Sequence, residues 1–245
     1  MKKLFLLASM LIFASFISFG QSASKTSADK NAAFTSAQSI RGWSIPAELS
    51  GQGYDIYLDT RVFRNGLASG SIKSISPIGN NRLKSAFLMQ TIKADDYRGK
   101  RLQISAYVKS ENVEHATLWM RMDGEGMQVF GLDVMDNRPI QGTTDWQRYD
   151  IVLDVPDETQ QIVFGINLKG DGQIWIDDIE FKDVGANVPT TTTKTPAEFA
   201  KGSAKRIEQY KTTNKDNYEK QLRAFLKRNT TAPPTPSNLD FENKR

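Results

Sequence analysis

The sequence predicts an all-β fold, a jelly-roll β-sandwich with a C-terminal linker and a basic helical tail. Residues 142–181 contain three consecutive segments in which apolar and polar residues alternate, at 146–155, 161–168 and 173–176. Alternation with a period of two is typical of half-buried antiparallel strands. Between residues 31 and 184, no segment with a helical period extends beyond two turns. Both observations favour a sandwich.

Further strands are predicted upstream, separated by turns rich in Gly, Asn and Asp. The clearest is 101–109, where Leu102, Ile104, Ala106 and Val108 share one face, and 116–122 repeats this pattern. The full upstream set is 54–58, 70–75, 86–92, 101–109, 116–122 and 128–132. Short strands at this spacing predict two packed sheets.

The N-terminal region has the pattern of an export signal. Residues 1–20 combine a basic start, an apolar stretch and small residues at Ser18 and Gly20, which predicts a signal peptide cleaved after Gly20. An uncleaved N-terminal anchor is the alternative. Residues 21–30 are rich in Ser, Ala and Lys and are expected to be disordered. The sandwich is expected over residues 31–185.

The C-terminal region changes character. Residues 186–195 form a Thr-rich linker, and a helical tail is expected over 196–228. Thr195, Pro196 and Glu198 fit the N-cap, first and third positions of a capped helix. Residues 229–245 are expected to be a flexible C-terminus.

Charge is divided unevenly along the chain. Residues 31–185 hold 16 Lys and Arg against 21 Asp and Glu, whereas residues 186–245 hold 12 against 6. The body has no basic patch with interleaved aromatic residues, so nucleic-acid binding is not expected. The chain has no Cys, which excludes a lipoprotein and disulfides. A periplasmic or extracellular protein, with no transmembrane helix after signal cleavage, is therefore expected.

Four motifs carry a resemblance to a known family. They are Tyr97-Arg98-Gly99-Lys100-Arg101, Leu118-Trp119-Met120-Arg121-Met122-Asp123-Gly124, Arg138-Pro139-Ile140 with Gly142-Thr143-Thr144-Asp145-Trp146, and Trp175-Ile176-Asp177-Asp178. On these motifs, residues 31–184 resemble a galactose-binding-like jelly-roll domain, related to carbohydrate-binding modules. The nearest resemblance is to a poorly characterised bacterial subgroup found in exported hydrolases and some regulators. It implies the sandwich fold and leaves the ligand open, because this fold hosts many ligands.

The family's opening motif, N-x-x-F-E, is incomplete where it is expected. It reads Asn31-Ala32-Ala33-Phe34-Thr35, with Thr35 in place of Glu, and the subgroup's D-N-M reads Asp133-Val134-Met135. The intact motif occurs instead at Asn238-Leu239-Asp240-Phe241-Glu242. It is either a remnant or chance match, or a returning segment that supplies an edge strand and places Glu242 near Asp177 and Asp178. Loop closure offsets the burial of Phe241, so a mostly free C-terminus is expected without Ca²⁺.

Outward-facing residues of the predicted strands suggest a ligand groove. If the strands share one concave sheet, the groove is lined by Tyr107, Trp119, Arg121, Trp146 and Asn167. Aromatic faces stack on sugar rings, and Arg and Asn satisfy hydroxyl groups. The alternative is that the two Trp residues cover hydrophobic edges or pack under loops.

Asp177 and Asp178 are candidate ligands of a structural calcium ion. The resemblance implies this ion, since related sandwiches hold Ca²⁺ near their chain ends, and Ca²⁺ takes six to eight oxygen ligands. A solvated turn that ends the strand is the alternative.

No catalytic residues are expected, and the chain is not predicted to be an enzyme. The single His, His115, is expected on a solvated loop or strand edge, and no nucleophile motif or opposed carboxylate pair stands out. The sequence therefore favours a non-catalytic exported module that binds glycan or another cell-envelope ligand. The alternative is a structural or interaction protein whose basic tail contacts an anionic envelope surface or a protein partner.

Overall fold

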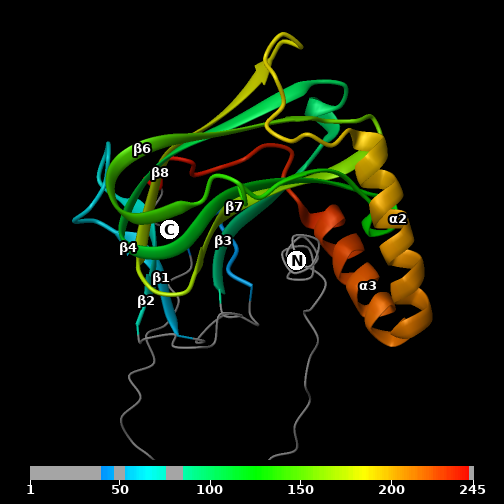
Figure 1. Cartoon of the computed structure of the whole chain (residues 1–245), viewed down its shortest axis with the longest axis horizontal. Helices are drawn as coiled ribbons and strands as arrows, with labels where there is room; N and C mark the ends of the chain where they lie inside the picture. Colours follow the sequence, from blue (N-terminus) through cyan, green and yellow to red (C-terminus); the bar gives the residue numbers. More distant parts are fainter. Residues whose placement is uncertain (1–39, 47–52, 76–84, 243–245) are drawn as a thin grey trace, which may run out of the picture. The chain divides into compact units, whose positions relative to one another are not determined.

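The computed structural model describes residues 40–46, 53–75 and 85–242, all within one compact unit, Thr35–Arg245. The expected signal peptide, the segment 21–30 and the motif at residues 31–35 lie outside the described residues. The described strands are β1 (Tyr54–Asp59), β2 (Ser69–Ser74), β3 (Ser85–Lys93), β4 (Arg101–Gly124), β5 (Val129–Asp133), β6 (Ile140–Asp154), β7 (Thr159–Lys169) and β8 (Gln173–Val184). The predicted β-sandwich with a helical tail is confirmed (Figure 1).

The long strand β4 takes part in both layers of the sandwich. Its first half pairs with β6 and β8, and its second half pairs with β7 and β5, all antiparallel. The strand order β1-β2-β8-β4-β7-β3 therefore runs through β4 from one layer to the other. The segments predicted at 101–109 and 116–122 are one strand, whose pairing with β6 shifts register between them. His115 lies within this strand, where it pairs with Lys169, and not on a loop.

The core lies between the two layers. The predicted faces of β4 are confirmed, because Leu102, Ile104, Ala106 and Val108 are buried in its first half. The second half buries Ala116, Leu118, Met120 and Met122 in the same core. Alternation thus continues through both halves of the strand, as a period of two requires.

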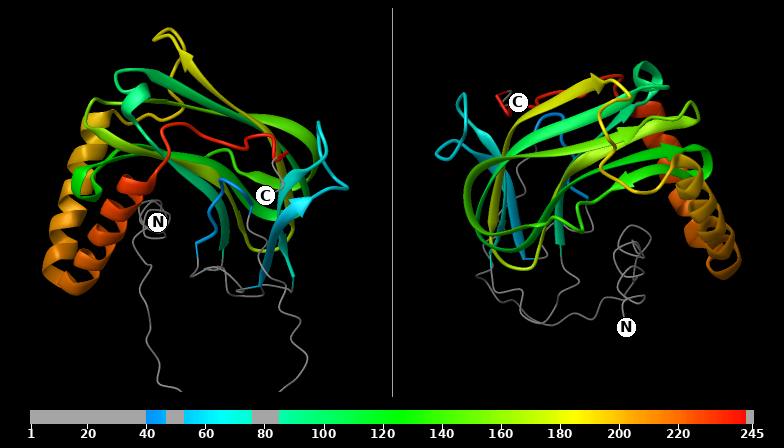
Figure 2. Two further views of the ribbon diagram at one scale, coloured as in Figure 1. Left: turned by 180° about the vertical axis from the view of Figure 1, so that it is seen from behind. Right: turned by 45° about the horizontal axis from the view of Figure 1, so that its top comes forward.

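Two helices follow the sandwich and pack against it. They are α2 (Pro196–Thr213), which begins with the expected capping box of Thr195 and Glu198, and α3 (Lys215–Thr231). The buried rings of Phe199 and Phe225 anchor them, and they lie side by side at one end of the sheet (Figures 1 and 2). Neither described α-helix is long and apolar enough to cross a bilayer.

The two ends of the described unit lie together between β3 and β8. Ser44 pairs with Met89 of β3, and the C-terminal strap, defined as residues 233–242, runs from α3 across the sandwich (Figure 2). Ile179 of β8 donates its N–H to the Leu239 carbonyl at 3.1 Å. The ring of Phe241 is fully buried.

The mostly free C-terminus expected from the sequence is therefore not what the structure shows. That expectation weighed one buried ring against the closure of a free segment of more than fifty residues. Because α2 and α3 are themselves packed on the sheet, only the short segment after α3 has to be closed into a loop. The entropy cost of closing a loop grows with its length, so this cost is smaller than expected. Hydrogen bonds add to the burial, including Lys93 N–H to the Pro233 carbonyl at 2.9 Å and Gln90 Nε2 to the Ser237 carbonyl at 2.6 Å.

Candidate functional site

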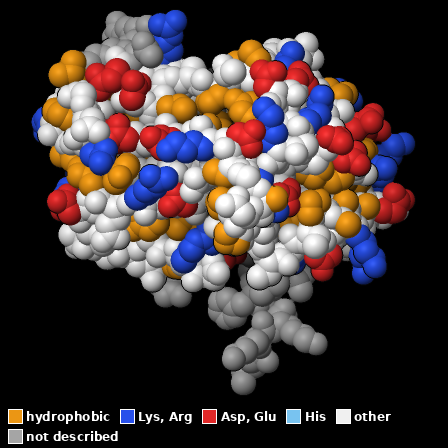
Figure 3. Space-filling view, turned by 90° about the horizontal axis from the view of Figure 1, so that it is seen from above, with side chains coloured by type: hydrophobic (Ala, Val, Ile, Leu, Met, Phe, Trp, Pro, Cys, Tyr) orange, Lys and Arg blue, Asp and Glu red, His pale blue; other side chains and the backbone are white. Residues whose placement is uncertain are grey.

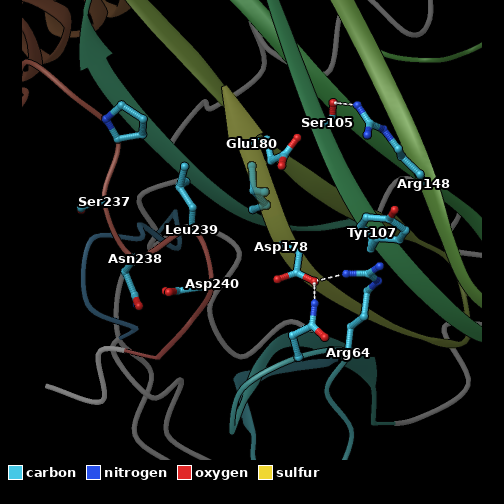
Figure 4. A pocket seen from close by; sticks show the side chains of 13 residues that line it. Arg64, Ser105, Tyr107, Arg148, Asp178, Glu180, Ser237, Asn238, Leu239 and Asp240 are labelled. Atoms are coloured by element: carbon cyan, nitrogen blue, oxygen red, sulfur yellow. Dashed lines mark hydrogen bonds and ion pairs between the residues drawn. The ribbon is translucent and has the colours of Figure 1, made fainter. Parts of the chain in front are cut away.

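A polar cavity of about 670 Å³ lies where β4, β6 and β8 meet the C-terminal strap (Figure 4). Its sheet side carries Ser105 and Tyr107 of β4, Arg148 of β6 and Glu180 of β8. The connection between β1 and β2 contributes Arg64 and Asn65. The strap contributes Pro236, Ser237, Asn238, Leu239 and Asp240. A concave site with several converging polar groups is typical of small-ligand binding.

Tyr107 of β4 lines the sheet side of the cavity. The guanidinium of Arg64 covers its ring, 3.5 Å from the ring centroid, which is the geometry of a cation–π contact. Tyr107 lies directly opposite Arg148 in the β4–β6 ladder. Its hydroxyl forms no hydrogen bond with the described residues. It is therefore available both to donate and to accept a hydrogen bond.

Arg148 is held beside Tyr107 by neighbours on the same face. Its Nη2 donates to Ser105 Oγ at 2.7 Å and its Nε donates to Asp150 Oδ1 at 3.0 Å. The hydrogen bond with Asp150 raises the pKa of Arg148, so the side chain stays charged. Figure 4 shows the guanidinium held against Ser105 at the wall of the cavity.

Asp178 of β8 forms hydrogen bonds with Arg64 and Asn65, which are called the Arg64 segment. Its Oδ2 accepts hydrogen bonds from Arg64 Nη1 and from Asn65 Nδ2 (Figure 4). Its backbone has φ +48°, a left-handed conformation that is uncommon outside Gly. The β4–β8 register shifts between Ser105 and Tyr107, opposite this residue. This irregularity places both Asp178 and Glu180 beside the cavity.

Asp177 lies behind the cavity wall and is fully buried. Its Oδ2 accepts the backbone N–H groups of Arg64 and Asn65 at 2.9 Å and 3.4 Å, and its Oδ1 accepts that of Asp178 at 2.8 Å. The pKa of Asp177 is raised to about 6, by burial above all and also by the neighbouring Asp178, although the three N–H groups lower it. Its role in this arrangement is to hold the Arg64 segment.

The predicted calcium ligands can be compared with this geometry. Backbone N–H groups, a guanidinium and an amide group donate to the oxygens of Asp177 and Asp178, which a cation would need as ligands. Glu242 does not join them, because its Oε1 accepts the N–H groups of Leu67 and Ala68 at 2.6 Å and 3.2 Å. In the described part of the chain, no three His, Asp or Glu side chains are grouped to hold a metal ion. As arranged, the residues do not fit the calcium ion, which remains an expectation from the sequence resemblance alone.

The five predicted groove residues fall into separate places. Tyr107 lines the cavity, whereas half-buried Trp146 lies farther along the edge strand β6. Trp119, Arg121 and Asn167 belong to the layer of β7 and the second half of β4. Trp119 is 1% exposed and meets the ring of Phe87 edge-on, with centroids 6.3 Å apart. Asn167 Oδ1 accepts a hydrogen bond from Thr117 Oγ1.

The cavity also contains residues that the sequence did not single out. Ser105 and Arg148 carry a recognisable signal, because both lie on outward faces of predicted strands. Arg64 carries only a turn signal, Arg64-Asn65-Gly66. No pattern in the sequence predicts that the Arg64 guanidinium contacts the ring of Tyr107. On the face shown in Figure 3, Lys and Arg side chains lie interspersed with Asp and Glu, without a patch of one sign.

Comparisons with known proteins find one curated relative and several solved structures of low sequence identity. No family model matches the chain. The chain is 41% identical over 163 residues, or 65% of its length, to the uncharacterized HTH-type transcriptional regulator YbfP of Bacillus subtilis (strain 168). It spans about half of that relative, 54%.

Similar solved structures include carbohydrate-binding modules, as the sequence resemblance implied. The CBM22-1 xylan-binding domain of Paenibacillus barcinonensis Xyn10C has a TM-score of 0.42 at 12% identity, over 59% of this chain and 87% of that one. The enzymatically active domain of bacteriophage CBA120 tailspike protein 4 has a TM-score of 0.44 at 13% identity, over 60% of this chain and 20% of that one. These likenesses are distant.

Proposed function

We propose that the chain is a non-catalytic, exported binding module that takes a saccharide or a similar polyhydroxylated ligand in the cavity between Tyr107 and the C-terminal strap. The observation that carries the proposal is the Tyr107 hydroxyl, which lacks a partner among the described residues and stands in a cavity of about 670 Å³. Arg148 is the residue paired with Tyr107 in the β4–β6 ladder, and its guanidinium is held by Ser105 and Asp150.

The chemistry of the lining matches a ligand rich in hydroxyl groups. Each hydroxyl both donates and accepts, so a saccharide needs donors and acceptors placed side by side. Arg148 supplies donors, the carboxylates of Glu180 and Asp240 supply acceptors, and the Tyr107 hydroxyl supplies both. The cavity is large enough for one or two sugar rings, given that ligand sites commonly span about 300–1,000 Å³.

The carboxylates of the cavity support binding over catalysis. A general acid in glycoside hydrolysis needs a raised pKa. The pKa of Glu180 is lowered instead, because Lys182 bonds to it at 2.7 Å. Asp177 has a raised pKa but does not line the cavity, and both of its oxygens accept backbone N–H groups.

Glycan-array binding, followed by calorimetric titration of the best glycan, tests the proposal. Tyr107→Ala and Glu180→Gln should each weaken binding by about tenfold, the cost of one lost hydrogen-bonding group. Glu111→Gln is the matched control, because Glu111 is an exposed carboxylate on β4 outside the cavity. Failure to bind any glycan, or equal binding by all three variants, would contradict the proposal.

The basic helices support a second candidate function, contact with an anionic envelope surface. Lys201, Lys205 and Lys227 are exposed on α2 and α3, and each basic residue near an anionic surface gives about 1 kcal/mol of attraction. Vesicles of anionic lipid test this function. Binding that 0.5 M salt abolishes and that the triple Lys→Gln variant loses would support it, whereas equal binding to neutral vesicles would contradict it.

A further inference from the structure

The helix α2 turns one side toward the end of β5. Ser203 is fully buried there, and its Oγ accepts the backbone N–H of Val129 at 3.1 Å. Arg206 follows Ser203 by three residues, so both lie on the same side of the helix. The side chain of Arg206 is accordingly half-buried.

The helix α3 approaches the same end of the sheet from β7. Gln161 Nε2 donates to the carbonyl of Phe225 at 3.2 Å, and both residues are buried. Arg228 follows Phe225 by three residues and is also half-buried. The two helices therefore bring one arginine each to the adjoining ends of β5 and β7.

The strand that lies between β5 and β7 adds a third arginine. Asp123 of β4 pairs with Val129 on one side and with Gln161 on the other. Arg121 holds Asp123 through two hydrogen bonds, Nε to Oδ1 and Nη2 to Oδ2, the latter at 2.6 Å. Val129 and Gln161, which form hydrogen bonds with α2 and α3, therefore lie on either side of Asp123.

The balance of charge at this place is positive. Arg121 holds Asp123 in a bidentate pair, Arg228 lies near both of these residues, and Arg206 lies near Arg121. The guanidinium groups of Arg206 and Arg228 form no ion pair and no hydrogen bond with the described residues. Burial, and then the neighbouring Arg121, lowers the pKa of Arg206. Burial also lowers the pKa of Arg228, which Asp123 raises and Arg121 lowers. Half-buried guanidinium groups without a counter-ion are costly.

We propose that Arg121, Arg206 and Arg228, called the arginine junction, bind an oxyanion, either a phosphate or the carboxylate of a sugar acid. The planar guanidinium matches the paired oxygens of both groups. Gln161 Oε1, buried at the same place, accepts no hydrogen bond. A ligand that carries a hydroxyl beside its anionic group supplies both the missing negative charge and the missing donor. This site is separate from the Tyr107 cavity and does not rest on the saccharide proposal.

Thermal melting of the full chain with inorganic phosphate or glucuronate, at constant ionic strength, tests the arginine junction. At tenfold excess over its Kd, a bound anion should raise Tm by about 3–5 °C. Arg206→Gln and Arg228→Gln should each remove this rise, and without anion they should melt no lower than the wild type. Lys205→Gln and Lys227→Gln remove the same charge from exposed neighbouring positions and should keep the rise.

Each outcome decides the proposal. A rise with phosphate alone assigns the site to phosphate, and a rise with glucuronate alone assigns it to a sugar acid. No saturable rise with either anion overturns the proposal. An equal rise in the arginine variants also overturns it, since it would reflect a general salt effect. Direct titration of the folded variants by calorimetry gives the same decision if a variant melts lower.

Discussion

The ring of Phe241 lies nearly parallel to that of Trp43, with centroids 5.1 Å apart and 18° between the planes. These residues come from opposite ends of the described unit, and the Trp43 indole N–H also donates to the Asn238 carbonyl at 3.0 Å. Stacked aromatic pairs add about 0.5–1.5 kcal/mol beyond their burial. The two ends of the unit therefore close the sandwich together, and the wall of the cavity depends on this closure.

Replacing the stacked ring should destabilise the whole sandwich. Phe241→Ala removes a fully buried side chain, which costs about 3–5 kcal/mol. Phe63→Ala is the matched control, since Phe63 is 37% exposed and its loss should cost about 0.5 kcal/mol or less. Urea denaturation measures both. Equal unfolding free energies for the two variants would mean that the strap is not packed in solution.

Glu242 should protect two specific backbone amides. Its carboxylate accepts the N–H groups of Leu67 and Ala68, so Glu242→Ala should speed their hydrogen exchange by about tenfold. Exchange within β2, which begins at Ser69, should change little. Glu219→Ala, on the exposed side of α3, serves as the control. Unchanged exchange at both amides in the Glu242 variant would show that the strap ends elsewhere.

Asp177 should make stability fall as the pH rises. Its folded pKa of about 6 lies above its ordinary value of 3.8, so the protonated form favours the folded state. This contribution is complete below pH 4 and is lost as the pH rises through 6, with a total on the order of 3 kcal/mol. Asp177→Asn should remove this slope in urea unfolding measured from pH 4 to 7. Exposed Asp183→Asn should retain it, and an unchanged slope in the Asp177 variant would refute the assignment.

Calcium should leave the melting temperature unchanged. The oxygens of Asp177 and Asp178 already accept hydrogen bonds from the Arg64 segment, and a cation would have to displace these donors. Full-length chain melted with millimolar Ca²⁺ and with chelator compares the two conditions. A Ca²⁺-dependent rise that Asp178→Asn abolishes would instead support the ion that the sequence resemblance implied.

The strands and helices could be predicted because they depend on local patterns. Alternation identified both halves of β4, and Thr195, Pro196 and Glu198 identified the start of α2. The sequence does not predict that the two halves form one strand, because the mostly polar residues 110–115 resemble a turn. In the structure they continue the strand, pairing with β6 through shifts of register and, at Ser110 and Glu111, with β8.

The candidate site was only partly predictable because it depends on long-range pairing. Outward alternation found Tyr107, but it could not show that Trp119 lies in the other layer. The contact of Arg64 with Tyr107 requires the Asp178 irregularity, which has no sequence signature. The docked strap was considered from its motif. Its docking looks too costly from the sequence, because the packing of α2 and α3, which shortens the closing segment, is a tertiary property.

The most direct test of the cavity as the binding site is a backbone amide NMR titration of the ¹⁵N-labelled full chain with the best glycan from the array. If the cavity binds the glycan, the largest chemical-shift changes should fall on Arg64, Tyr107 and Arg148 together with Leu239 and Asp240 of the strap. Changes that gather instead around Trp119 and Asn167, with the strap unaffected, would contradict it and place binding on the other layer.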